Sequence, residues 1–181
     1  MKLNLNSSDF ELFSLPEQFA QDSAAIDERW KDLQREVHPD KFAAQGPSAQ
    51  RVAMQWSVRV NEAYQRLRDP LQRAAYLCER KGAPINAETN TAMPGAFLLE
   101  QMAWREALDD VRSEGDLDGL VKQLTAARSK ALAQIEALLD ATGDAPAAAG
   151  QVRALMFIER FANDVEARFE QFDTQSMDRT R

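Results

Sequence analysis

Apolar residues recur every three or four positions along most of the chain, which is the spacing of a helix that buries one face. This pattern predicts two N-terminal helices, over residues 22–37 and 48–68, after a short apolar piece that ends at Pro16. Asp69 and Pro70 then read as an N-cap followed by proline at the first helical position, which predicts another short helix. The apolar stripes of the two long helices are Ile26, Trp30, Leu33 and Val37, and Ala53, Trp56, Val60 and Leu67.

Three longer helical patterns follow, at about residues 95–113, 116–140 and 151–173. The connections between them are short, and short connections favour antiparallel neighbours, so these segments predict a three-helix bundle. We expect the alanine-rich stretch from Asp140 to Gly150 to be a mobile loop. The fold class predicted by the whole pattern is all-α, with an N-terminal helical hairpin and a C-terminal three-helix bundle.

The charges divide unevenly between the two predicted parts. The 181 residues include 22 Lys and Arg and 29 Asp and Glu, a net charge of −7. Residues 1–78 hold 10 basic and 11 acidic side chains, whereas residues 79–181 hold 12 and 18, so the net charges are −1 and −6. We therefore expect one unit over residues 1–78, a linker over residues 79–94 and the bundle over residues 95–181.

Composition excludes several classes of function. The acidic balance argues against sequence-independent binding of nucleic acid, which normally needs a basic face. A single cysteine, Cys78, and a single histidine, His38, cannot build a disulfide or a metal site of several Cys or His ligands, so we expect no metal and no cofactor. The chain has no apolar run near the length of a membrane span, and its start lacks a secretory apolar region, so we expect no membrane partner and a cytoplasmic location.

The tripeptide His38-Pro39-Asp40 is the most informative motif. Proline cannot continue the preceding helix, so we expect this HPD loop to lie exposed between the two helices of the hairpin. Cations flank it, and because the apolar stripe of the first helix faces inward, these side chains should face outward. Acidic residues alternate with them, so an ordinary solvated surface of mixed charge remains an alternative. The cations are Arg29, Lys31, Arg35 and Lys41.

The first helix of the predicted bundle carries a second apolar stripe, made of Leu98, Leu99 and Met102. A helix that packs through one face should not have one. Either the rest of the molecule covers this stripe, or it is an exposed patch for a partner. Glu106 and Asp110 would form the rim of the patch, and Phe157, about 100° away from the stripe of the last helix, could extend it. We interpret Tyr76, Trp30, Trp56 and Cys78 as core or inter-unit packing residues.

The N-terminal residues resemble a J-domain, over about residues 8–78. The motifs that carry the resemblance are Phe10-Glu11-Leu12-Phe13, His38-Pro39-Asp40-Lys41-Phe42, Asn61-Glu62-Ala63-Tyr64 and Leu67-Arg68-Asp69-Pro70. The Gly/Phe-rich linker and the zinc-binding cysteines of typical J-domain proteins do not follow, and the chain is instead similar to the HscB family over nearly its whole length. The further motifs for that family are Pro70-Leu71-Gln72-Arg73-Ala74, Ala96-Phe97-Leu98-Leu99-Glu100-Gln101-Met102, Trp104-Arg105-Glu106 and Val152-Arg153-Ala154-Leu155-Met156-Phe157.

The resemblance implies a co-chaperone and not an enzyme. J-domain proteins stimulate the ATPase of DnaK-type chaperones, and HscB-type proteins deliver the iron–sulfur scaffold IscU to an HscA-like chaperone. It implies that the chaperone is bound by Arg29, Lys31, Arg35, His38, Pro39, Asp40 and Lys41. It implies that the scaffold is bound by Leu98, Leu99, Met102, Glu106, Asp110 and Phe157.

Three questions stay open at this point. Ala103 stands where the family often has an acidic residue, which puts the electrostatic part of the scaffold contact in doubt. A general J-domain protein could use the same apolar patch for unfolded clients, and a purely structural helical module could carry an inert HPD loop. We expect a monomer or a weak dimer.

Overall fold

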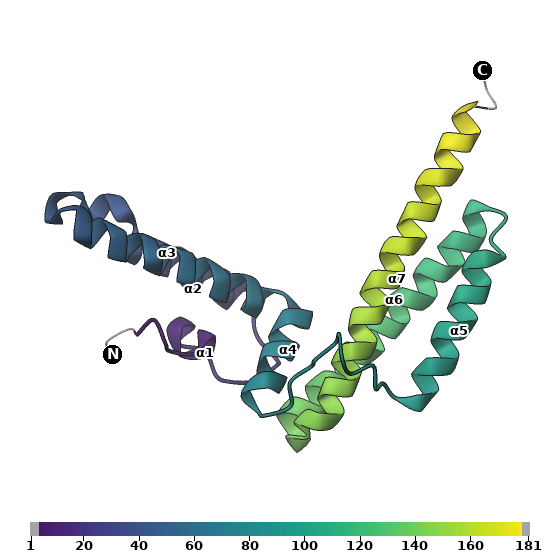
Figure 1. The fold of residues 1–181 in the computed structure, drawn as a ribbon, viewed down its shortest axis with the longest axis horizontal. Helices are drawn as coiled ribbons and strands as arrows, with labels where there is room; N and C mark the ends of the chain where they lie inside the picture. Colours follow the sequence, from purple (N-terminus) through teal and green to yellow (C-terminus); the bar gives the residue numbers. More distant parts are fainter. Residues whose placement is uncertain (1–3, 179–181) are drawn as a thin grey trace.

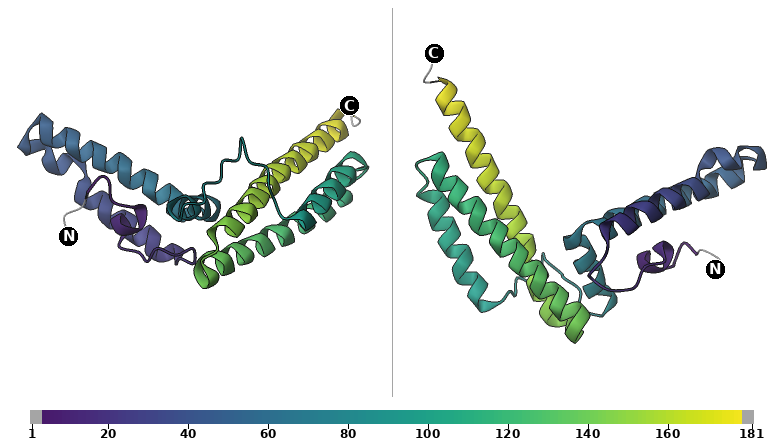
Figure 2. Two further views of the ribbon diagram at one scale, coloured as in Figure 1. Left: turned by 60° about the horizontal axis from the view of Figure 1, so that its bottom comes forward. Right: turned by 180° about the vertical axis from the view of Figure 1, so that it is seen from behind.

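The computed structural model describes residues 4–178, and the side chains of that range up to residue 171. Every regular element in this range is helical, which confirms the all-α prediction. The helices form two arms that meet at one end (Figure 1). The views from below and from behind show the same two arms (Figure 2). Within the described range, no helix is both long enough and apolar enough to cross a membrane.

The N-terminal arm is built on an antiparallel hairpin of α2 (Ser23–Val37) and α3 (Pro47–Arg68), as predicted. Its two helices bury complementary apolar stripes against each other. Asp22 caps the start of α2 by accepting a hydrogen bond from the backbone of Ala24, at 2.9 Å. The stripe residues that are almost fully buried are Ile26, Leu33, Val60, Ala63 and Leu67.

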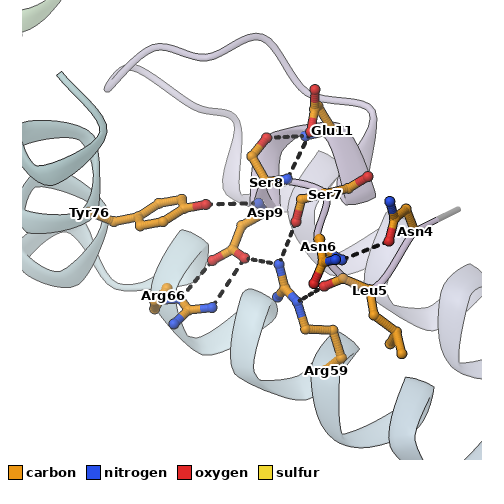
Figure 3. Close-up of polar contacts among 10 residues, drawn as sticks. All are labelled: Asn4, Leu5, Asn6, Ser7, Ser8, Asp9, Glu11, Arg59, Arg66 and Tyr76. Atoms are coloured by element: carbon orange, nitrogen blue, oxygen red, sulfur yellow. Dashed lines mark hydrogen bonds and ion pairs between the residues drawn. The ribbon is translucent and has the colours of Figure 1, made fainter.

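A short helix, α1 (Asp9–Phe13), packs across this hairpin through three buried apolar side chains. Asp9 holds it in place, because its fully buried carboxylate pairs with Arg66 at 2.7 Å and with Arg59 at 2.6 Å (Figure 3). The backbone N–H of Asp9 also donates to the hydroxyl of Tyr76, at 3.1 Å. The Asp9 carboxylate therefore connects α1 to α3, and its backbone N–H connects α1 to α4. The apolar residues of α1 are Phe10, Leu12 and Phe13.

Helix α4 (Pro70–Arg80) lies at the junction of the two arms. It begins at the predicted cap, where the side chain of Asp69 accepts a hydrogen bond from the backbone of Gln72 at 2.8 Å. Its buried residues Ala74, Leu77 and Cys78 join the apolar cluster that runs from α1 to the last helix, against which α4 packs. The prediction that Cys78 is a buried packing residue is therefore confirmed.

The second arm contains α5 (Gly95–Asp109), α6 (Glu114–Glu136) and α7 (Ala145–Asp178), which run up, down and up. A capping box at Ser113 starts α6: the Ser113 hydroxyl accepts from the backbone of Asp116, and the Asp116 carboxylate accepts from the backbone of Ser113. α6 and α7 form the main contact, and α7 continues past the α5–α6 connection (Figure 1). Aromatic rings join α5 to α7, and they belong to Phe97, Trp104, Phe157 and Phe161.

The prediction of a mobile loop between Asp140 and Gly150 is wrong. α6 continues into a π-helical segment, η2 (Ala137–Thr142), and α7 begins at Ala145, only a few residues later. Gly143 makes the turn with φ +70°, a conformation that glycine adopts easily. The alanines are good helix formers, and Ala148 is fully buried because its small side chain allows close helix packing. Alanine richness here indicates tight packing.

The junction of the arms is held by polar contacts as well as by apolar packing. The carboxylate of Asp140 accepts hydrogen bonds from the backbone N–H groups of Phe19 and Ala20, at 2.7 and 2.8 Å. The buried guanidinium of Arg73, on α4, donates to the carbonyl of Phe19 at 2.8 Å and lies over its ring. Arg153, on α7, donates to the carbonyls of Ala92 and Ile85 in the connection between α4 and α5.

Candidate functional site

The HPD motif occupies the outer tip of the N-terminal arm, the end furthest from the bundle (Figure 1). His38 ends α2, and the following residues form a 3₁₀ helix, η1 (Pro39–Gln45), where a loop was predicted. The reason is local: His38 also caps η1, with its Nδ1 accepting a hydrogen bond from the backbone of Asp40 at 3.3 Å. The predicted exposure is confirmed, since the side chains of His38 and Asp40 are 57% and 90% exposed.

The cations near this motif fall into two groups. Lys31, Arg35 and Lys41 are exposed, as predicted, and Arg35 lies 3.4 Å from Asp32 across one turn of α2. Arg29 is different: its side chain is only 28% exposed, and its Nε is buried without a hydrogen-bond partner. The helical wheel explains this, because Arg29 lies about 60° from Ile26, on the edge of the buried stripe. The prediction that it faces outward is wrong.

An apolar hollow of about 470 Å³ lies beside the HPD turn. Val37 and Phe42 line it from either side of the motif, and Val52 and Trp56 line it from α3. The sequence pattern predicted Trp56 as a core residue and did not reveal the hollow. The available signal was Val52, an aliphatic side chain on the outer flank of the predicted stripe, which is half exposed in the structure.

The second apolar stripe of α5 is exposed. Leu98, Leu99 and Met102 are 43%, 71% and 58% exposed, and no other helix covers them within the described residues. This outcome rules out the alternative in which the rest of the molecule buries the stripe. Glu106 and Asp110 are also exposed, and Asp110 forms the C-cap of α5. Exposed apolar residues of this kind, rimmed by charge, are typical of a protein-binding surface.

Phe157 lies at the edge of this surface and is half-buried. Its ring meets that of Phe97 edge-on at 5.7 Å and stacks on Phe161 at 5.9 Å. The guanidinium of Arg105 lies over the same ring, 5.4 Å from its centre. Phe157 therefore joins the α5 surface to the core of the bundle. Arg105 was not among the predicted site residues, and only its place beside Leu98 on the helical wheel could have pointed to it.

The remaining singled-out residues have packing roles. Tyr76 stacks on Phe10 at 5.9 Å, and Trp30 stacks on Tyr64 at 4.9 Å while its indole N–H donates to Asn61. Burial raises the pKa of the Cys78 thiol to about 11, so the thiol is protonated at neutral pH and is a poor metal ligand. In the described part of the chain, no three His, Cys, Asp or Glu side chains come together as a metal site would require.

Comparison with known proteins gives consistent matches over this architecture. A family model described as the HSCB C-terminal oligomerisation domain matches residues 93–166. The co-chaperone protein HscB homolog of Burkholderia vietnamiensis is 49% identical over 175 residues, which cover 95% of this chain and 99% of that protein. The homolog from Paraburkholderia xenovorans is 47% identical over 173 residues, 94% of this chain and 98% of that protein.

Solved structures agree with these matches. The chaperone HscB from Vibrio cholerae has a TM-score of 0.78 and 37% identity, with 91% of this chain and 99% of that one covered. The human co-chaperone protein HscB has a TM-score of 0.84 over 92% of this chain and 84% of that one, and at 24% identity it supports the fold. This all-helical chain, with an HPD turn on one arm and a helical bundle as the other, thus matches HscB proteins over nearly its whole length, and it belongs to the HscB family of co-chaperones.

Proposed function

We propose that this chain stimulates the ATPase of a DnaK-type, HscA-like chaperone and delivers an IscU-type iron–sulfur scaffold to it. The observation that carries the proposal is the presence of two exposed surfaces of different chemistry on the two arms. A polar HPD turn lies at the tip of one arm, and an apolar patch lies along α5 of the other. In this proposal residues 1–78 are the J-domain, residues 79–94 the linker and residues 95–181 the scaffold-binding bundle.

The chaperone side acts through charge and hydrogen bonding. Lys31, Arg35 and Lys41 form an exposed basic surface that suits an acidic face of the chaperone. Pro39 and the caps made by His38 fix the turn, so the Asp40 carboxylate is presented at the tip with little conformational freedom to lose on binding. Docking would favour the hydrolysis-competent state of the chaperone, which is a shift of population and needs no catalytic group in this chain.

The scaffold side acts through apolar burial. Leu98, Leu99 and Met102 project from the solvent face of α5, where a folded partner can cover them. Glu106 and Asp110 add a negative rim, which orients a partner that carries cations, and Phe157 supports the patch from α7. A family member with these two surfaces works by handling proteins in the cytoplasm.

The chaperone side is tested by His38→Gln. Gln keeps polarity and size but cannot reproduce the imidazole cap, so stimulation of the chaperone's ATPase should fall to the unstimulated rate in single-turnover assays. Circular dichroism should show an unchanged helical content. Lys41→Ala should reduce stimulation several-fold, and Lys81→Ala is the matched control, an exposed lysine at the end of α4. Full stimulation by His38→Gln would end the J-domain assignment.

The scaffold side is tested by replacing Leu98, Leu99 and Met102 together with Ala. Affinity for a folded IscU-type scaffold should fall on the order of 100-fold, because three apolar contacts are truncated at the centre of the interface. Met54→Ala with Val58→Ala is the control, two similarly exposed apolar residues on α3. If the triple variant bound the scaffold normally and lost unfolded clients instead, the chain would be a general J-domain protein.

A further inference from the structure

Arg105 makes an unusual contact for an exposed arginine of the bundle. It projects from α5 over the ring of Phe157 on α7, with Cζ 5.4 Å from the ring centre. A guanidinium over an aromatic face is attracted by the ring's quadrupole and stacks well because it is planar. Phe97 and Phe161 contact the same ring from the core side. Arg105 therefore closes the solvent side of an aromatic cluster.

The position of Arg105 on α5 places it within the apolar patch. It follows Leu98 by seven residues and Met102 by three, so the three side chains lie within about 60° of the helix circumference. Glu106 is on the opposite side of Met102. The charge around the patch thus changes from positive at Arg105 to negative at Glu106 and Asp110, with Leu98 and Met102 between them.

Several arginines pair with a carboxylate, and Arg105 is not one of them in the described part of the chain. Arg80 pairs with Glu17, and Arg128 pairs with Glu159 at 3.3 Å. Among the side chains that the structure describes, no carboxylate lies within 4.0 Å of the Arg105 guanidinium. One face of the Arg105 guanidinium lies against the Phe157 ring. The N–H groups along the edge of the guanidinium remain available to a partner.

We propose that Arg105 is a specificity-determining residue of the scaffold-binding patch, which rests on the function proposed above. Its plane holds the Phe157 ring in position, and its edge binds a carboxylate of the scaffold. The occupant is a folded scaffold whose apolar surface is flanked by a carboxylate facing Arg105 and by a cation facing Glu106 and Asp110. This opposed pair of charges allows one orientation of the scaffold on α5 and disfavours the reverse.

The substitution at the acidic end strengthens this assignment. Ala103 brings no charge to the exposed surface of α5, so the negative rim consists of Glu106 and Asp110. With fewer acidic groups to orient the partner, the cation at the other end contributes a larger share of the electrostatic selection. Arg105→Glu should therefore be more harmful than the loss of either rim carboxylate.

The test measures the dissociation constant for an IscU-type scaffold by titration calorimetry. Arg105→Glu should weaken binding on the order of tenfold, and Arg105→Met, which keeps length and removes charge, about threefold. The matched control is Arg51→Glu, which makes the same change of charge at an exposed arginine on α3 of the other arm, and it should bind within about twofold of the unmodified protein. The dependence of affinity on salt should be weaker for Arg105→Met than for the unmodified protein.

A charge-reversal scan of the scaffold separates a direct contact from a purely structural effect. Each scaffold Asp or Glu is changed to Lys in turn, and one such variant should restore binding to Arg105→Glu while weakening binding to the unmodified chain. Normal affinity of Arg105→Glu, together with loss of binding in the Leu98, Leu99 and Met102 variant, would overturn the role of Arg105 and leave the proposed function intact. Loss of affinity that no reversal restores would mean a structural role alone, and absence of binding by the unmodified protein would overturn both proposals.

Discussion

The contacts that hold the helices together differ between the two arms of the molecule. In the N-terminal arm, a fully buried carboxylate ties together helices that are far apart in the sequence: Asp9, on α1, pairs with Arg59 and Arg66 of α3, at 2.6 and 2.7 Å. In the bundle, stacked and edge-on aromatic rings join α5 to α7, and ion pairs such as Arg128–Glu159 lie at the surface. This difference in internal contacts is related to a difference in exposed surface, which is charged at the tip of the N-terminal arm and apolar along α5 of the bundle.

The lengths of the helices explain the contrast. α1 has 5 residues and cannot bury enough apolar surface to hold its place alone, so it depends on the Asp9 carboxylate. α5 has 15 residues and packs through one aromatic face, which leaves its opposite face free for Leu98, Leu99 and Met102. The N-terminal arm thus presents charge at its tip, and the bundle presents apolar residues along one helix.

Among substitutions that remove these contacts, Asp9→Asn should have the largest effect on stability. The change keeps the shape of the side chain but removes the negative charge from between Arg59 and Arg66, and the Nη1 of Arg59 is already buried without a partner. Two cations near a buried site would then face each other, so the free energy of unfolding should fall by about 3 kcal/mol. Urea denaturation followed by far-ultraviolet circular dichroism measures it.

The matched control lies in the other arm. Glu159→Gln makes the same chemical change in the Arg128–Glu159 pair, whose side chains are both partly exposed, and it should alter stability by less than about 0.5 kcal/mol. Equal effects of the two substitutions would mean that the polar contacts of the two arms are equivalent, contrary to the difference described above.

A smaller loss of stability should follow from Asp140→Ala, which removes polar contacts at the junction of the two arms. Two charge-assisted hydrogen bonds to the backbone of Phe19 and Ala20 would be lost at a site that is partly open to solvent, so stability should fall by about 2 kcal/mol. The apolar contact between α4 and α7 would remain. A spin-label distance between the tip of α3 and the C-terminal part of α7 should therefore broaden while the helical content stays constant.

The control for the junction is Asp144→Ala, a nearby exposed aspartate whose carboxylate accepts from the backbone of Ala147 within α7. It removes a local helix cap and should leave the distance distribution unchanged. A distribution that stays narrow in Asp140→Ala would show that apolar packing alone fixes the relative position of the arms.

The sequence was most informative where the relevant residues are neighbours along the chain. The exposure of the HPD motif, the cap at Asp69 and the second apolar stripe on α5 all depend on local order and helical periodicity, and these predictions agree with the structure. Family membership also followed from motifs of this kind. The residues expected to bind chaperone and scaffold remain a proposal, because exposure and geometry alone do not identify a partner.

The sequence was least informative where distant segments determine the outcome. Asp140 lies 120 residues from its partner Ala20, so the contact that orders the segment around it could not be predicted from the neighbouring residues. Arg29 was expected to face outward because the apolar stripe of its helix faces inward, but Arg29 lies at the edge of that stripe and is half-buried. The stacking of Arg105 on Phe157 connects two helices and could not be read from either of them.

The smallest predicted effect on stability concerns Cys78, which lies at the boundary between the two arms. It is fully buried on α4, where that helix packs against the bundle, and burial raises the pKa of its thiol from 9.0 to about 11. The unfolded chain therefore releases this proton at lower pH than the folded chain. Between these two pKa values the folded state binds more protons, so stability must fall as the pH rises.

We expect the free energy of unfolding to fall by about 1 kcal/mol more in the unmodified protein than in Cys78→Ala when the pH is raised from about 8 to about 10. The comparison of slopes removes the titration of other groups, such as Tyr64, whose pKa is raised by its hydrogen bond to Asp27. It also removes any constant loss of stability caused by the smaller side chain. Urea denaturation across this pH range measures how the free energy of unfolding changes with pH in both proteins. Parallel slopes would mean that the thiol ionises as freely in the folded chain as in the unfolded one. The junction between the arms would then admit solvent.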